Sequence, residues 1–509
     1  MDRIFGIDLG TTNSVIAYTD PMGTTEVIAG QDGNRIVPSV VYFGKDGNQI
    51  VGTNARERAI IEPERVAMLF KRGMGEKTFL DNEMPFVVDG KTLSPEELSA
   101  SVLKKLAGMA EERFREPVRK VVITVPAYFG DNERAATKLA GEIAGLEVVR
   151  IVNEPTAAAI AHGLDSGSSG RILVFDLGGG TFDVTVMQVA PDGSMQVLST
   201  GGDRRLGGMD FDYLILGKMI VTARQGGLDI ETEAWARQDA YGKAEALKKN
   251  LSSMEEASTS LTGSGRPMAF EMTRAQFEKL IRDKVTATED TTLYTLEQAD
   301  LQPSDIGTVL MVGGSSRIPV FQKMLERVFG RPPAFSRNLD EDVARGAAML
   351  GAKEGGELDP RAALAQMKKP VDVCAHGLGI TTTNEETRQE YNSIIIAPQT
   401  PVPAFGEGMY STLEEGQTRI GISLNEGDEE DLEYVKSIAE GDAKFGRTVP
   451  KDYPIRVTIS FNLDGMIELN AYDGATDAFM CKLEVKRAGL ISDDRAASAA
   501  AALKRTKVS

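Results

Sequence analysis

The sequence contains very few of the residues that build disulfide, zinc or histidine-based sites. It has two cysteines, two histidines and one tryptophan among 509 residues. Cys374 and Cys481 are too few and too far apart for a disulfide framework or a thiolate metal site. His162 and His376 stand alone in the sequence. These scarcities argue against a disulfide scaffold, a zinc enzyme and histidine-based catalysis.

The chain also lacks an excess of basic residues and any long hydrophobic run. Its formal net charge of −18 argues against a nucleic-acid binder, because nothing basic collects to neutralise phosphates. No segment offers the ~20 apolar residues that span a bilayer, and no basic-then-apolar signal opens the chain. We therefore expect a cytoplasmic protein without nucleic-acid or membrane partners. The length predicts several domains.

One short stretch, FGIDLGTTNS at residues 5–14, joins an apolar run to a polar turn. The run carries Asp8, breaks at Gly10 and continues into hydroxyl and amide side chains. Glycine allows the backbone to approach an anion, turn amides and hydroxyls donate to phosphate oxygens, and a carboxylate suits hydrated Mg²⁺. By itself the stretch is also compatible with a hairpin turn that binds nothing.

A second copy of this pattern favours the phosphate interpretation. Residues 172–184, ILVFDLGGGTFDV, repeat the apolar run, the aspartate (Asp176), the glycines and the threonine (Thr181). Two half-sites that face each other would surround a phosphate chain from both sides.

The remaining pattern predicts two kinds of domain. Strands and helices alternate to about residue 353, which indicates an α/β architecture built twice. Charged residues, glycines and prolines suggest a linker at 354–371. From Asp372 the period changes to two, which predicts an antiparallel β domain over 372–488. The tail, 489–509, is alanine-rich and can form one short helix at most.

Seven ordered motifs carry a resemblance to the Hsp70 (DnaK-type) chaperone family over residues 1–488. That resemblance implies a duplicated actin-like (ribonuclease H-like) ATPase domain of two lobes, followed by an antiparallel β-sandwich that binds peptides. The motifs are GIDLGTTNS, the helix after the N-cap Ser94, VPAYF at 125–129, IVNEPTAAAIA at 151–161, FDLGGGTFDV at 175–184, LGGMDFD at 206–212 and GGSSRIP at 313–319.

The resemblance also implies roles for individual residues. Without the resemblance, we would expect Lys71 to be a solvated surface lysine and Glu154 to be a charge at a helix N-terminus. The motif position of Lys71 instead implies that it is the catalytic lysine. Asp8, Glu154 and Asp176 would hold the waters of Mg²⁺, and Asp183 would contact this hydrated cation cluster. K⁺ is a further candidate cation. Catalysis would involve these carboxylates with Lys71 and Thr181. ATP or ADP would contact Gly10, Thr11, Thr12, Asn13, Gly178, Gly179, Gly180, Thr181, Asp183, Gly207, Gly208, Glu245, Lys248, Lys249, Ser252, Gly313, Gly314, Ser315, Arg317 and Asp340.

In the β domain the resemblance implies a groove for extended, apolar peptide. Its lining would be Ile380, Tyr410, Leu413, Ile420 and Ile422, although the same residues are also expected in a sandwich core.

The resemblance further implies a J-domain partner, a nucleotide exchange factor and unfolded polypeptide clients. Arg150, Asn153 and Thr156 match positions that contact J-domains. Two departures stand out. Lys368-Lys369-Pro370 replaces the family's leucine-like linker, so we expect poor strand addition there, and the helical lid is expected to be absent.

We therefore expect an ATP-hydrolysing, lidless Hsp70-type chaperone. Two alternatives remain open from the sequence. One is a nucleotide-switched adaptor or assembly factor without refolding activity, and the other is an actin-fold kinase of small molecules.

Overall fold

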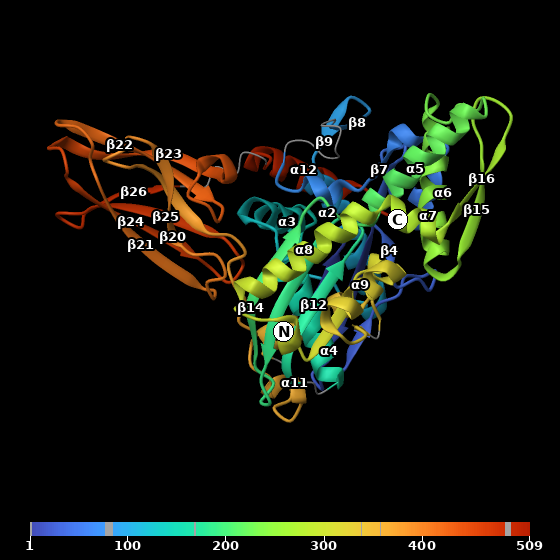
Figure 1. The fold of residues 1–509 in the computed structure, drawn as a ribbon, viewed down its shortest axis with the longest axis horizontal. Coiled ribbons are helices and arrows are strands. Elements are labelled where there is room, and N and C mark those ends of the chain that lie inside the picture. Colours follow the sequence, from blue (N-terminus) through green and yellow to red (C-terminus); the bar gives the residue numbers. More distant parts are fainter. Residues whose placement is uncertain (1–2, 77–84, 167–168, 337, 357, 484–489) are drawn as a thin grey trace.

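Two sheets with the same strand order form the first part of the protein (Figure 1). The computed structural model describes residues 3–76, 85–166, 169–336, 338–356, 358–483 and 490–509. In lobe I the order is β3-β2-β1-β10-β11, and in lobe II it is β14-β13-β12-β17-β18. Each sheet combines an antiparallel hairpin with two parallel strands in equivalent places. This shared topology confirms the duplicated α/β fold.

The strands of these two sheets are short and mostly buried on both faces, as expected for continuous apolar runs. Lobe I contains β1 (Ile4–Leu9), β2 (Asn13–Thr19), β3 (Thr25–Val27), β4 (Val37–Pro38, paired with β2), β10 (Lys120–Val125) and β11 (Glu147–Asn153). Lobe II contains β12 (Gly170–Leu177), β13 (Phe182–Val189), β14 (Met195–Asp203), β17 (Thr308–Val312) and β18 (Ala334–Phe335).

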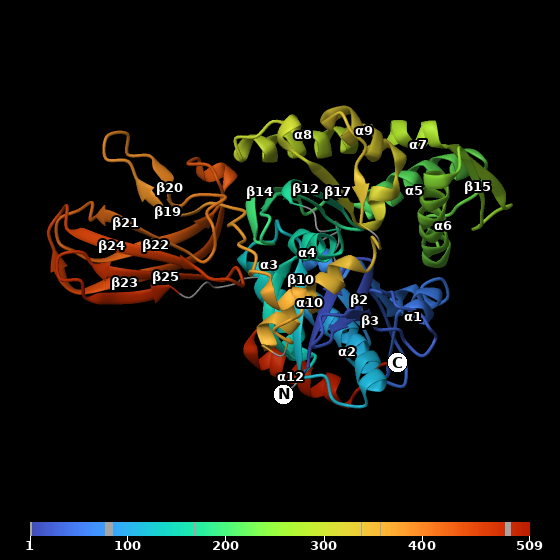
Figure 2. The same cartoon turned by 90° about the horizontal axis from the view of Figure 1, so that it is seen from below.

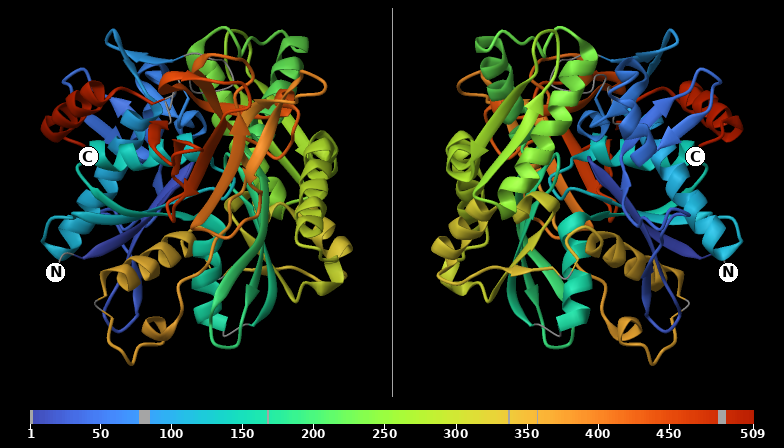
Figure 3. Two further views of the ribbon diagram at one scale, coloured as in Figure 1. Left: turned by 90° about the vertical axis from the view of Figure 1, so that its left-hand side faces the viewer. Right: turned by 90° about the vertical axis from the view of Figure 1, so that its right-hand side faces the viewer.

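Two helices lie between the lobe sheets and share one apolar cluster with both. They are α4 (Glu154–Ser166) and α10 (Asp342–Gly355). Their contact is very close, because a Cβ built on Gly346 would lie 1.9 Å from the carbonyl oxygen of Ala157. The small residues of α10 therefore allow the two helices to pack tightly. End-on views show lobe I in blue and cyan beside lobe II in green and yellow (Figure 3).

The outer faces of the lobes carry further helices. On lobe I these are α2 (Pro95–Phe114) and α3 (Asp131–Ile143), and on lobe II they include α8 (Arg282–Gln298) and α9 (Pro319–Phe329). Helix α2 begins with a capping box in which the Ser94 hydroxyl accepts from the Glu97 amide and the Glu97 carboxylate accepts from the Ser94 amide. The cap predicted for Ser94 is therefore confirmed.

Each lobe also has a small additional subdomain. Lobe I carries β5 (Val40–Phe43), β6 (Gln49–Val51), β7 (Val66–Met68), β8 (Phe86–Val88), β9 (Lys91–Leu93), α1 (Thr53–Arg58) and the 3₁₀ turns η1 (Pro63–Arg65) and η2 (Phe70–Gly73). Lobe II carries α5 (Gly208–Gln225), α6 (Ala234–Ser253), β15 (Glu256–Leu261), β16 (Met268–Thr273) and α7 (Arg274–Leu280). The helical patterning of residues 211–251 thus corresponds to two helices, α5 and α6.

After the linker, two four-stranded antiparallel sheets enclose an apolar core. Their strand orders are β20-β19-β22-β23 and β21-β24-β25-β26. This arrangement is the β-sandwich expected from period-two patterning. The strands are β19 (Leu378–Thr383), β20 (Glu390–Ile396), β21 (Ala404–Ser411), β22 (Gln417–Glu426), β23 (Lys436–Val449), β24 (Pro454–Phe461), β25 (Ile467–Asp473) and β26 (Phe479–Leu483). The predicted boundary at residue 488 lies outside the described residues.

The sandwich rests against lobe I and the edge of lobe II (Figure 2). Asp131 of α3 accepts a hydrogen bond from the Ile467 amide at 3.0 Å, and the Gln399 side chain exchanges two bonds of 2.9 Å with the backbone of Thr200. Within the described part of the chain, none of the helices combines the length and apolarity needed to cross a bilayer.

The linker does pair with lobe II, so our expectation of poor strand addition is wrong at one residue. Val371 forms a parallel bridge to Gln196 of β14, with backbone bonds of 2.9 and 3.0 Å. Pro370 does not prevent this pairing, because the donor and the acceptor both belong to Val371. Lys368 and Lys369 stay half exposed and bind Asp192 and Glu354, each at 2.6 Å.

Reversing both linker charges should loosen this pairing. In Lys368→Glu/Lys369→Glu, two attractions become repulsions from Asp192 and Glu354. Because exposed ion pairs contribute little, we expect only about two- to fivefold faster amide exchange at Val371 and Val197. Hydrogen exchange read by NMR measures this. The neutral pair Lys368→Gln/Lys369→Gln should fall between the two proteins, and identical exchange in all three would contradict the prediction.

Candidate functional site

A cavity of about 730 Å³ opens between the two lobes, within the range of small-molecule sites. Residues of both duplicated motifs line it, together with α6 and the turn after β17. Most of the residues predicted to bind nucleotide lie on its wall: Asp8, Gly10, Thr11, Thr12, Asn13, Lys71, Glu154, Asp176, Gly178, Gly179, Thr181, Glu245, Lys248, Lys249, Ser252, Gly313, Gly314, Ser315, Arg317 and Asp340.

The two hairpin turns meet at the base of this cavity. A Cβ on Gly179 would lie 2.5 Å from the Thr12 side chain, and a Cβ on Gly180 would lie 2.5 Å from that of Thr11. Only glycine allows the turns to approach so closely. Backbone amides and threonine hydroxyls of both lobes can therefore face one phosphate chain.

Lys71 lies inside the cavity rather than in solvent. It belongs to the turn η2, which follows Leu69 in the left-handed conformation (φ 61°). Its side chain is 3% exposed, and its Nζ donates to Glu154 Oε1 at 2.7 Å. Glu154 is the first residue of α4 directly after β11. The expectation of a solvated lysine is therefore wrong for Lys71. Glu154 does lie in the first turn of a helix, as expected, and its carboxylate also pairs with Lys71.

Three buried aspartates crowd around this ion pair. Burial and repulsion from Glu154 raise the pKa of Asp8 to about 7. The same two causes raise the pKa of Asp183 to about 7 and that of Asp176 well above its usual range. A cation would relieve this repulsion. Among the described residues, no three Asp, Glu, His or Cys side chains lie close enough to hold a metal together. The raised pKa values of these carboxyl groups show that the cavity has room for additional positive charge, and carboxylates are suitable partners for the waters of a hydrated Mg²⁺ ion.

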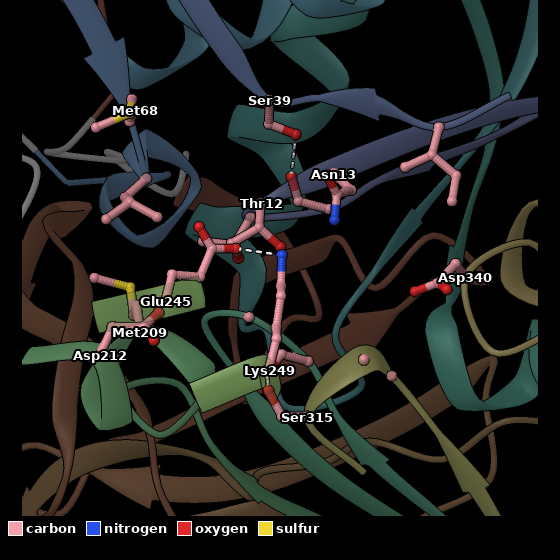
Figure 4. A pocket seen from close by; sticks show the side chains of 18 of the residues that line it. Thr12, Asn13, Ser39, Met68, Met209, Asp212, Glu245, Lys249, Ser315 and Asp340 are labelled. Atoms are coloured by element: carbon pink, nitrogen blue, oxygen red, sulfur yellow. Dashed lines mark hydrogen bonds and ion pairs between the residues drawn. The ribbon is translucent and has the colours of Figure 1, made fainter. Parts of the chain in front are cut away.

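The opposite wall carries charged residues of α6. Glu245 pairs with Arg56 of α1 and with Lys249 at 2.7 Å, the latter visible in Figure 4. Lys248 is buried, and its Nζ donates to the Gly208 carbonyl and to Asp212, both at 2.9 Å. Lys248 therefore supports the wall through Asp212 as well as facing the cavity.

Asp340 lies on the cavity wall. An aspartate just before a small-residue-rich helical segment is expected to cap that helix, but Asp340 does not cap α10. The N-cap of α10 is Glu341, without a side-chain capping bond. Asp340 instead accepts from Arg317 at 2.7 Å, and this pair connects two turns of lobe II at the rim.

Four predicted residues lie behind the wall rather than on it: Gly180, Asp183, Gly207 and Gly208. Asp183 Oδ1 accepts from the Tyr128 amide at 2.9 Å, so this carboxylate orients the loop after β10. The glycines allow close contact, since a Cβ on Gly207 would lie 2.6 Å from the Gly180 amide nitrogen.

Sequence reasoning missed three polar residues of the site. Arg56 pairs with Glu245 across the cavity. The Nε of Arg72 donates to the Gly180 carbonyl at 2.8 Å, and the guanidinium of Arg72 also binds Asp210. Ser39 Oγ donates to the Gly10 carbonyl at 2.7 Å. Only Arg72 carried a usable signal, because it is adjacent to Lys71. The partners of all three residues lie far from them in the sequence.

A model of the family described as "Hsp70 protein" matches residues 4–501. The chain belongs to the Hsp70 family. Hsp70 relatives named "Chaperone protein DnaK" from Thermotoga neapolitana, Thermotoga petrophila and Thermotoga maritima are each 40% identical to it over 483 residues, covering 92% of this chain and 78% of the relative.

The residues predicted for the peptide groove of this Hsp70 protein divide into two groups. Ile380 and Ile422 are 5% and 4% exposed and belong to the sandwich core. Tyr410, Leu413 and Ile420 are half-buried. The Tyr410 hydroxyl shares a 3.0 Å hydrogen bond with the Ser393 hydroxyl. Only the second group presents surface that a ligand can reach in this conformation.

Proposed function

We propose that this Hsp70 protein is a chaperone that binds and hydrolyses ATP between its lobes and binds extended polypeptide on its sandwich. The observation that carries the proposal is the Lys71–Glu154 pair, buried between two phosphate-type hairpins and beside Asp8 and Asp176. The domain division proposed with it is 1–353 for the ATPase, 354–371 for the linker, 372–488 for the sandwich and 489–509 for the tail.

Each part of the cavity has a role in this proposal. Thr11, Thr12 and Thr181 hold the phosphates through hydroxyls and backbone amides. Lys71 orients the attacking water and opposes negative charge on the terminal phosphoryl group. Glu154 fixes the position of the Lys71 ammonium. Bound Mg²⁺ supplies positive charge to the phosphate oxygens, and Asp8, Asp176 and Glu154 hold its waters.

Adenosine is assigned to the wall formed by α6 and the turn after β17. Glu245, Lys249 and Ser252 provide polar atoms on α6, and Gly314 provides open backbone. Arg317 and Asp340 form the rim. This side of the cavity determines affinity for the nucleotide, whereas the Lys71 side determines the rate of hydrolysis.

A negative charge introduced into the proposed groove should weaken peptide binding more than the same charge placed elsewhere on the sandwich surface. We expect Ile420→Asp to weaken binding of a fluorescein-labelled, leucine-rich heptapeptide by at least about tenfold, because burying a carboxylate is costly. Fluorescence anisotropy with ADP and with ATP measures this. The control is Met409→Asp, since Met409 is 61% exposed on β21. Equal weakening in both variants, or no binding by the unmodified protein, would contradict the groove assignment and favour the adaptor alternative.

We also propose that a J-domain co-chaperone binds at three residues that are buried in this conformation. Arg150, Asn153 and Thr156 are 9% exposed or less. The Thr156 hydroxyl contacts Asp372 of the sandwich domain, and Arg150 pairs with Glu354. A J-domain would therefore reach these residues only after the contacts with Asp372 and Glu354 are broken. A nucleotide exchange factor would act on the same cavity by separating the lobes.

A further inference from the structure

The last helix of the chain packs on lobe I instead of on the sandwich that precedes it (Figure 2). Helix α12 (Asp493–Arg505) contacts both α2 and α3. Ala496 and Leu503, seven residues apart on one face, are buried against Ala100 of α2 and Ile143 of α3. We call residues 492–509 the strap.

Polar contacts fasten both ends of this helix. Near its start, Arg495 donates to Glu97 Oε2 at 2.6 Å and to the Thr92 carbonyl at 2.7 Å. At its end, Lys104 of α2 donates to the carbonyls of Leu503 and Thr506. A cation at this position satisfies unpaired carbonyls and complements the helix dipole.

Beyond the helix, the end of the strap runs alongside β6. Residue 508 forms a parallel bridge to Gln49 of β6. The Gln49 amide donates to the Lys507 carbonyl at 3.0 Å, the Val51 amide to the Ser509 carbonyl at 2.9 Å, and the Ser509 amide to the Gln49 carbonyl at 3.1 Å. In the sheet β6-β5-β7, β6 is otherwise an edge strand. The strap therefore covers an edge that is open to strand addition.

This edge is directly connected to the nucleotide cavity. Strand β6 continues through Gly52 into α1, and Thr53 and Arg56 of α1 line the cavity. Arg56 pairs with Glu245 on the opposite lobe. The segment 49–58, which we call the lip, thus has the strap on its outer side and the nucleotide cavity on its inner side.

We propose that the strap is an intramolecular device that holds the lip and so slows nucleotide release. The proposal rests on the proposed nucleotide binding in the cavity. A short alanine-rich helix is marginal by itself, so the strap can detach when its contacts weaken. Strand β26 ends at Leu483, shortly before the strap, and chain connectivity therefore links movement of the sandwich to release of the lip.

Removal of residues 507–509 tests the strand contact with little risk to folding. It deletes all three backbone bonds to β6, so the Gln49 and Val51 amides should lose protection from hydrogen exchange. Release of a fluorescent ADP analogue, followed by stopped flow, should become about three- to tenfold faster, since each bond adds modestly to the stability of the lip.

A matched pair of variants tests the helix. Leu503→Asp places a carboxylate in the buried seam, whereas Ala502→Asp places it on the exposed face of the same helix. Only Leu503→Asp should speed release of the ADP analogue and reduce the hydrogen-exchange protection of the Gln49 and Val51 amides. Unchanged release despite lost protection would overturn the proposal, as would unchanged protection after removal of 507–509. Failure of the intact protein to bind ADP would overturn the proposed function instead, while the exchange data would still show whether the strap covers β6.

Discussion

Replacing Lys71 with alanine is expected to slow ATP hydrolysis in a single turnover by about 10²- to 10³-fold, the loss typical of removing one preorganised charge from a transition state. The Nζ lies 2.7 Å from Glu154 and is the positive group closest to that carboxylate among the contacts described. Nucleotide affinity should change much less, because the wall proposed for adenosine is on α6. Rapid-quench measurement of pre-bound ATP separates the two quantities.

Lys249→Ala is the matched control for this prediction. The Lys249 side chain is 62% exposed and pairs with Glu245 on the wall proposed for adenosine. Its removal should weaken nucleotide binding several-fold and leave the single-turnover rate unchanged. A normal rate in Lys71→Ala, or an equal loss of rate in both variants, would remove Lys71 from its proposed role. A phosphorylated small molecule formed by the unmodified protein would favour the kinase alternative.

The second large effect is a loss of stability when a single methyl group is added at Gly346. Gly346→Ala puts a Cβ where the Ala157 carbonyl oxygen lies 1.9 Å away, and rigid backbone on both sides leaves no flexible atom to move. We expect the free energy of unfolding to fall by at least about 3 kcal/mol, at the upper end of overpacking costs. Because α4 begins at Glu154, the shift should also disturb the Lys71 pair and reduce hydrolysis.

Gly217→Ala provides the same chemical change without a clash. Gly217 lies in α5, and nothing stands within 4 Å of its built Cβ. This substitution should stabilise the protein by up to about 1 kcal/mol through helix propensity. Urea denaturation followed by circular dichroism compares the two. Equal midpoints for the Gly346 and Gly217 variants would show that the α4–α10 contact tolerates a side chain.

Much of the fold followed from local patterns. Two apolar runs with an aspartate and a glycine turn predicted the duplicated sheets, and period-two alternation predicted the sandwich. Boundaries were less accurate. Helical patterning over 211–251 did not show the break between α5 and α6, and the cap expected at Asp340 lies at Glu341. Such ends depend on tertiary packing, which local propensity does not contain.

The sequence by itself determined the hairpin turns, the family and most residues of the cavity wall. These features depend on contiguous motifs, in which local strand and turn geometry sets the direction of each side chain. The tertiary structure decided which charges meet. Lys71 pairs with Glu154, Arg56 crosses to Glu245, and Val371 bonds to β14 despite a linker that seemed unsuited to pairing. Only the structure placed the strap on β6. These contacts join segments far apart in the chain, and neither hydrophobic period nor motif spacing encodes a partner at such separation.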